Sequence, residues 1–124
     1  MALDFFSQED TFCETENYMA YLELEPQSSQ LLGSFEMGEF ARLTPWIELC
    51  NQQGIKLGHF FDDTALRNYQ LPQVLENLRH CYGEIAQRPP FVHPSEIHKG
   101  AFVKMVSVLE TAIQQKRGII ALCD

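Results

Sequence analysis

The chain has 124 residues, a length that fits one domain with a core of its own. Hydrophobic residues make up 45% of it and include nine Phe, which excludes an intrinsically disordered chain. The formal net charge of −8 is unevenly distributed: residues 1–40 hold nine acids and no Lys or Arg, whereas residues 41–124 hold eight acids and nine bases. This asymmetry argues against binding of nucleic acid or an anionic membrane by the first third and suits a basic protein partner.

The start of the chain and its cysteines predict a cytoplasmic protein. The first residues lack the positive charges and the long apolar stretch of a secretory signal. No run approaches the ~18 apolar residues that a membrane-spanning helix needs. The cysteines, at positions 13, 50, 81 and 123, form no CxxC pair, so we expect four thiols in a reducing compartment. The apolar patterns around Cys81 and Cys123 favour core positions over nucleophiles.

The first third of the chain predicts strands. Leu3–Phe6 is a candidate short strand. In the stretch Tyr18–Glu25, core-like residues alternate with a mixed aromatic and acidic row, as in a strand with one buried face. The sequence PQSSQ then predicts a turn, and Leu31–Phe35 predicts a return strand that would complete a hairpin.

The middle of the chain predicts two helices around a strand. Thr44 as N-cap and Pro45 at the first helical position predict a helix that ends at Gly54. Apolar residues before Thr44 leave open a longer helix that is kinked at Pro45. Ile55–Phe61 alternates like a strand, and Pro72–Gln87 carries the apolar stripe of a second helix.

The last thirty residues hold the longest pattern in the sequence, a helix followed by a strand. Pro94 suits the first helical position, and Lys116 and Arg117 suit the last turn. We expect Gly118 to take the left-handed conformation, followed by an interior strand at IIALC. The predicted buried stripe of the helix comprises Ile97, Ala101, Met105, Val108 and Ala112, with Phe102, Val106, Leu109 and Ile113 beside it.

This order of elements predicts a single domain, residues 1–124. Its fold class is α+β or α/β, with one small mixed sheet and about three helices packed on it. The strand at the C-terminus should be interior because it shows no polar alternation.

Few residues suggest a catalytic or metal-binding site. Asp62 and Asp63 follow a predicted strand and, with His59, could serve a metal or act as a general base, although a turn explains them more simply. His93 and His98 are five residues apart, which does not bring both to one metal on a helix. We therefore assign no catalytic, cofactor-binding or metal-binding residues. A small enzyme that uses Asp62, Asp63 or His59 and a structural adaptor subunit remain as alternatives.

The acidic first third is the candidate partner-binding surface, because acids mixed with aromatic anchors are typical of protein interfaces. A solvated face that only keeps the protein soluble would look similar. The partner would be a basic protein, and neither nucleic acid nor a membrane is expected. The predicted partner-binding residues are Asp10, Glu14, Glu16, Tyr21, Glu23, Glu25, Glu36 and Glu39.

The second half of the chain resembles a known family. The segment GIKLGHFFDDTALRNYQLPQVLENL, a closing helix and the final GIIALCD, together residues 54–124, resemble immunity proteins of bacterial polymorphic toxins, including those of contact-dependent growth inhibition. The resemblance rests on the order of elements and not on an invariant motif. It implies a non-enzymatic inhibitor that binds a cognate toxin, often a nuclease. The acidic face would then occupy the site that the toxin uses for its polyanionic substrate.

Charge reversal tests the predicted outward row of Tyr18–Glu25. Changing Glu23 and Glu25 together to Lys should alter the free energy of unfolding by about 0.5 kcal/mol or less. It should also slow association with a basic partner and weaken the salt dependence. Tyr21→Ala should instead speed dissociation, at a cost of ~2 kcal/mol in binding. Binding kinetics at two ionic strengths measure both effects, and unchanged kinetics in both variants would remove this strand from the interface.

Overall fold

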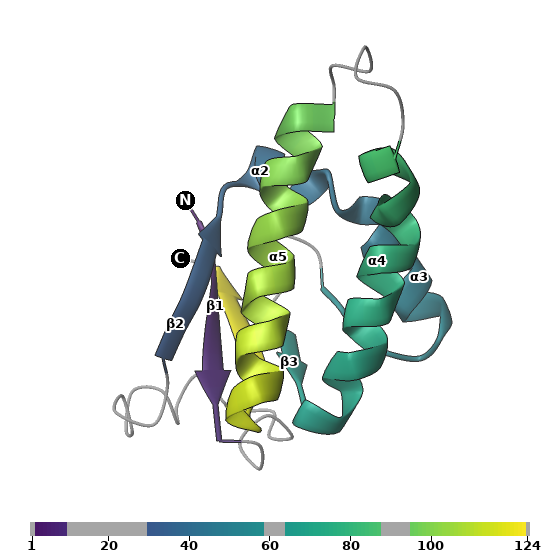
Figure 1. The fold of residues 1–124 in the computed structure, drawn as a ribbon. Coiled ribbons are helices and arrows are strands. Elements are labelled where there is room, and N and C mark those ends of the chain that lie inside the picture. The colour runs from purple at the N-terminus through teal and green to yellow at the C-terminus, as the bar shows by residue number, and fades with distance from the viewer. Residues whose placement is uncertain (1, 10–29, 59–63, 88–94, 124) are drawn as a thin grey trace.

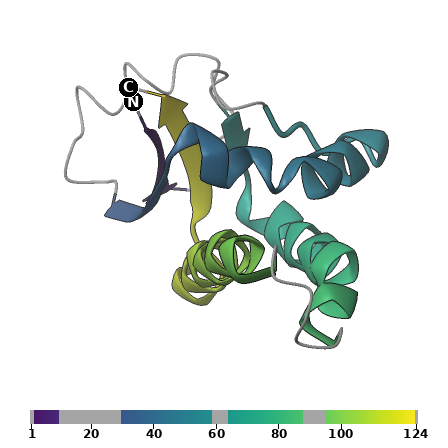
Figure 2. The same cartoon turned by 90° about the horizontal axis from the view of Figure 1, so that it is seen from above.

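The structure is a computed structural model that describes residues 2–9, 30–58, 64–87 and 95–123. Its sheet has the strand order β2-β1-β4-β3, and α4 and α5 lie side by side on one face of it (Figures 1 and 2). The described elements are, in chain order, β1 (Leu3–Gln8), β2 (Gln30–Phe35), α2 (Met37–Ala41), α3 (Thr44–Gln52), β3 (Thr64–Leu66), η3 (Asn68–Gln70), α4 (Leu71–Gln87), α5 (Ser95–Gln115) and β4 (Gly118–Cys123).

The predicted α+β class is confirmed, and the sheet is antiparallel rather than mixed. The three strand pairs that the structure describes, β1 with β2, β1 with β4 and β3 with β4, all run antiparallel. The strand β4 is interior, as predicted, because it lies between β1 and β3. Consecutive residues Ile119, Ile120 and Ala121 are buried, which explains why the sequence of β4 lacks polar alternation.

The edge strand β2 confirms the predicted return strand at Leu31–Phe35, and it pairs with β1. The register shifts between Phe5 and Phe6, where β2 has an extra residue. A Cβ on Gly33 would lie 2.9 Å from Cγ2 of Val108, so the absence of a side chain lets β2 approach α5 closely. The predicted strand Tyr18–Glu25 lies outside the described residues.

The prediction of a strand at Ile55–Phe61 is wrong where the structure describes it, because residues 55–58 have no regular structure. Ile55 and Leu57 are buried alternately as expected. However, two backbone N–H groups of this segment donate to side chains. The N–H of Leu57 donates to Asn51 Oδ1 at 2.9 Å, and the N–H of Gly58 donates to Thr64 Oγ1 at 2.8 Å. The strand is instead β3, whose three residues pair with β4.

The helix boundaries are close to the predicted ones, with changes at the caps. Leu43, and not Thr44, is the N-cap of α3, and the Thr44 hydroxyl donates to the carbonyl of Ala41 at 2.6 Å. The alternative of one longer kinked helix is wrong, because α2 is a separate helix that ends at Ala41. Gly54 terminates α3 as predicted, with a φ of 83°.

The core lies between the sheet and the helices. Most of the α5 residues predicted to be buried are at most 1% exposed: Ala101, Met105, Val108, Leu109 and Ala112. Three of the neighbouring row, Phe102, Val106 and Ile113, are only partly buried, and the side chain of Ile97 lies outside the description. Phe5, Phe35 and Phe40 form an aromatic cluster with ring centroids 5.4–6.1 Å apart. These contacts bury the inner side of α2 against β1 and β2.

The end of α5 differs from the prediction, because the helix ends at Gln115 and Lys116 and Arg117 follow its last turn instead of lying in it. Lys116, and not Gly118, takes the left-handed conformation, with a φ of 58°, while Gly118 begins β4. The N–H of Lys116 donates to the carbonyl of Ile113 and that of Arg117 to the carbonyl of Ala112, which is a Schellman motif. A residue with a Cβ is strained in this conformation.

Relief of this strain is testable. Lys116→Gly should raise the free energy of unfolding by about 0.5–1 kcal/mol, because glycine adopts positive φ without the steric cost. The matched control is Gly54→Ala, which introduces the same kind of strain at the end of α3 and should destabilise the protein. Urea unfolding of both variants measures the changes. A destabilised Lys116→Gly would contradict the left-handed backbone at this residue.

Candidate partner-binding surface

The structure describes two of the eight predicted partner-binding residues, Glu36 and Glu39, at the turn from β2 into α2. The other six, from Asp10 to Glu25, lie outside the described residues. So do His59, Asp62 and Asp63, which the alternative enzymatic interpretation uses. The described part of the candidate surface is therefore the β2–α2 turn.

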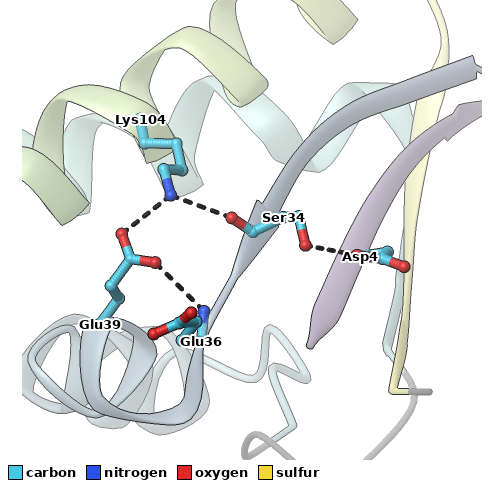
Figure 3. Close-up of polar contacts among 5 residues, drawn as sticks. All are labelled: Asp4, Ser34, Glu36, Glu39 and Lys104. Atoms are coloured by element: carbon cyan, nitrogen blue, oxygen red, sulfur yellow. Dashed lines mark hydrogen bonds and ion pairs between the residues drawn. The ribbon is translucent and has the colours of Figure 1, made fainter. Parts of the chain in front are cut away.

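Glu39 is paired inside the protein (Figure 3). The Lys104 ammonium, from α5, donates to Glu39 Oε2 at 2.8 Å and to the carbonyl of Ser34 at 3.0 Å. Its Nζ also lies 4.9 Å from the centroid of the Phe35 ring. The hydrogen bond from Lys104 lowers the pKa of Glu39 below its ordinary value, against the opposing effect of burial. A base in the second half of the chain therefore neutralises one acid of the first third.

Further hydrogen bonds connect this pair to the neighbouring strands (Figure 3). Glu39 Oε1 accepts from the backbone N–H of Glu36 at 3.2 Å, which satisfies a donor at the start of α2. The Ser34 hydroxyl donates to Asp4 Oδ1 at 2.6 Å. The contacts of Lys104, Glu39, Ser34 and Asp4 thus join α5, α2, β2 and β1 in one polar network.

The outer side of the same turn remains exposed. Glu36 is exposed, and Met37 is 54% exposed although its side chain is apolar. On the inner side, Phe40 is only 4% exposed. We call Glu36, Met37 and Glu39 the β2–α2 corner. It presents a carboxylate beside a polarisable thioether on a helix whose position is set by the Lys104 network, and these are the groups that a basic and partly apolar partner surface would contact.

A concave feature lies between α3 and α4. It is an open pocket of 240 Å³, lined by Leu49, Gln53, Gln73, Glu76, Asn77 and His80. Sequence reasoning did not single out these residues. The sequence signal that could have found the pocket was Asn77, because it follows Val74 by three residues and so places an amide beside the apolar stripe of α4. In the structure Asn77 is only 3% exposed.

The two cysteines whose side chains the structure describes, Cys50 and Cys81, are free thiols, as predicted. Burial raises the pKa of both, which keeps them protonated and poorly nucleophilic. Burial likewise raises the pKa of Tyr82, whose hydroxyl donates to the carbonyl of Arg42 at 2.7 Å. These groups serve the packing of α3 and α4, and among the described residues no three His, Cys, Asp or Glu gather as a metal site.

The described residues thus define a small α+β protein with a four-stranded antiparallel sheet and two long helices on one face. None of the helices in the described ranges has the length and apolar character to cross a membrane. Comparisons with protein-family models, with curated proteins and with solved structures give no significant match.

The Lys104–Glu39 pair should make stability depend on pH. Because folding lowers the pKa of Glu39, its contribution is fully present above its ordinary value of 4.5 and is lost as pH falls through the lower folded-state pKa. Lys104→Met should lower the free energy of unfolding by about 1 kcal/mol at pH 7 and by less at pH 3.

Arg79→Met is the matched control for this prediction. Arg79 pairs with Glu110, but both side chains are more than half exposed. Its loss should therefore change stability by only a few tenths of a kcal/mol, roughly the value of an exposed pair. Urea unfolding of both variants from pH 3 to pH 8 tests the difference, and equal effects would mean that Lys104 makes no more than a surface contact.

Proposed function

We propose that the protein is a non-enzymatic inhibitor that binds and masks a basic protein partner, in the manner of the immunity proteins it resembles. The partner would be a bacterial toxin of the polymorphic or contact-dependent growth inhibition type, and a nuclease suits the charge best. The site of action would be the cytoplasm, where such a toxin meets its substrate. The observation that carries this proposal is the β2–α2 corner.

Preorganisation of the corner supports a role in binding. Lys104 fixes Glu39, and the aromatic cluster fixes Phe40, so the exposed side chains of Glu36 and Met37 project from a backbone that is already ordered. Binding then requires little loss of conformational entropy beyond that of the two side chains. A contact through Met37 would exclude water from the centre of the interface, and the neighbouring Glu36 would attract a basic partner.

The charge distribution supports the choice of partner. Nine acids lie in residues 1–40, and one of them, Glu39, forms an ion pair with Lys104. A nuclease domain carries a cationic surface that binds a polyanion. An acidic surface on this protein would compete for that surface, and the same charges would accelerate encounter with the toxin.

The first experiment identifies the partner. The tagged protein is used to capture a stoichiometric basic protein, which is identified by mass and then purified. Association and dissociation rates are measured for the wild-type protein, Glu36→Lys and Met37→Ala. Glu48→Lys is the matched control, because Glu48 is an exposed acid on α3 and its reversal makes the same change in net charge.

The expected results separate the two corner residues. Glu36→Lys should slow association severalfold more than Glu48→Lys at low ionic strength, because its charge would lie at the interface. Met37→Ala should act on dissociation, raising the rate about tenfold if Met37 is a contact worth ~1.4 kcal/mol. Identical rates for all three variants would place the interface elsewhere, and a partner without a basic surface would contradict the proposal itself.

A further inference from the structure

The pocket between α3 and α4 is lined by an ordered chain of amides. Asn77 Nδ2 donates to Gln53 Oε1 at 2.7 Å and lies 3.3 Å from Cys50 Sγ. Asn77 Oδ1 accepts from Gln73 Nε2 at 2.9 Å. Because Asn77 is buried and fully bonded, it holds the two glutamines in fixed positions on opposite helices.

These internal bonds leave both acceptors and donors for a ligand. Gln73 Nε2 donates to Asn77, so Gln73 Oε1 is available as an acceptor, whereas Gln53 Oε1 accepts from Asn77, so the Gln53 NH₂ group is available as a donor. Glu76 adds a carboxylate, and neither Glu76 nor His80 has a hydrogen-bond or ion-pair partner in the part of the chain that the structure describes. The pocket therefore combines the negative charge of Glu76 with the directed amide oxygen of Gln73.

We propose that this pocket binds a guanidinium group, the side chain of an arginine on the protein partner. The planar guanidinium has five N–H donors, which can bind the carboxylate of Glu76 and the amide oxygen of Gln73 together. Leu49 supplies an apolar wall for the methylene groups of the arginine. The assignment deepens the proposed function and rests on it for the source of the arginine.

Other ligand classes fit the pocket less well. An anion would face the Glu76 carboxylate, and the lining residues include no Lys or Arg to offset the repulsion. An ammonium group would use fewer of the separated acceptors than a planar fork does. A divalent metal would have Glu76 and His80, one turn apart on α4, but no third charged or imidazole ligand within the described ranges.

A small guanidinium probe tests the pocket without the protein partner. N-acetyl-arginine methylamide is titrated into the ¹⁵N-labelled full chain, with N-acetyl-norleucine methylamide as the uncharged control. The arginine probe should shift the side-chain amide signals of Gln53 and Gln73, and the norleucine probe should not. Glu76→Gln should weaken binding about fivefold, whereas Glu48→Gln, an exposed acid on α3 outside the pocket, should leave it unchanged.

Two kinds of result would overturn the assignment of the pocket to a guanidinium group. Equal binding by wild type and Glu76→Gln, or shifts spread over all exposed acids, would show non-specific attraction to a negative protein. Shifts caused by Zn²⁺ near His80, without any response to the arginine probe, would make the pocket a metal site. The probe tests the pocket without the partner. If the probe binds but the protein inhibits no toxin, the proposed function is wrong and the assignment of the pocket still stands.

Discussion

The pairing of β1 with β4 is the constraint on which the rest of the structure depends. Residues 3–8 align with residues 118–123 in the centre of the sheet, so the two ends of the sequence form its middle. The outer strands β2 and β3 each pair with one of these two. Closing so long a loop costs conformational entropy that only the buried apolar contacts can offset. The central pair therefore depends on the core, to which α5, the helix directly before β4, contributes Ala101, Met105, Val108, Leu109 and Ala112.

The candidate surface depends on the same long-range packing. Lys104 reaches the β2–α2 corner only because α5 lies against β2. The two elements can approach this closely because Gly33 has no side chain that would collide with Val108. The aromatic cluster of Phe5, Phe35 and Phe40 then holds α2 against β1 and β2. The rigidity of the corner is a tertiary property, and a five-residue helix would have little stability of its own.

Local patterns in the sequence were sufficient for most elements of this fold. The apolar stripes of α4 and α5 and the unbroken apolar run of β4 each predict their element because burial imposes a period on the sequence. The failures have local causes. The alternation of Ile55 and Leu57 reflects real burial, but side-chain acceptors from Asn51 and Thr64 replace a neighbouring strand. At the end of α5 the chain uses Lys116 where a glycine was the better expectation.

The candidate site was less predictable, because its contacts join distant residues. Glu36 and Glu39 could be selected from charge alone, but their different roles depend on Lys104, which is 65 positions after Glu39. No spacing rule connects these residues. The pocket between α3 and α4 was missed for the same reason, since Gln53 and Asn77 come together only when the two helices pack.

The internal pairing of Glu39 has a consequence for how the corner can discriminate among cations. A cation from outside that engages Glu39 must either displace the Lys104 ammonium or share the carboxylate with it. Displacement exchanges one ion pair for another, so the net gain is small, and the freed ammonium would also lose its bond to Ser34 and its contact with the Phe35 ring. Sharing is possible only for a donor that approaches the carboxylate from the side that Lys104 leaves open. Glu39 would thus accept cations from one direction only, whereas the exposed Glu36 can be approached from many.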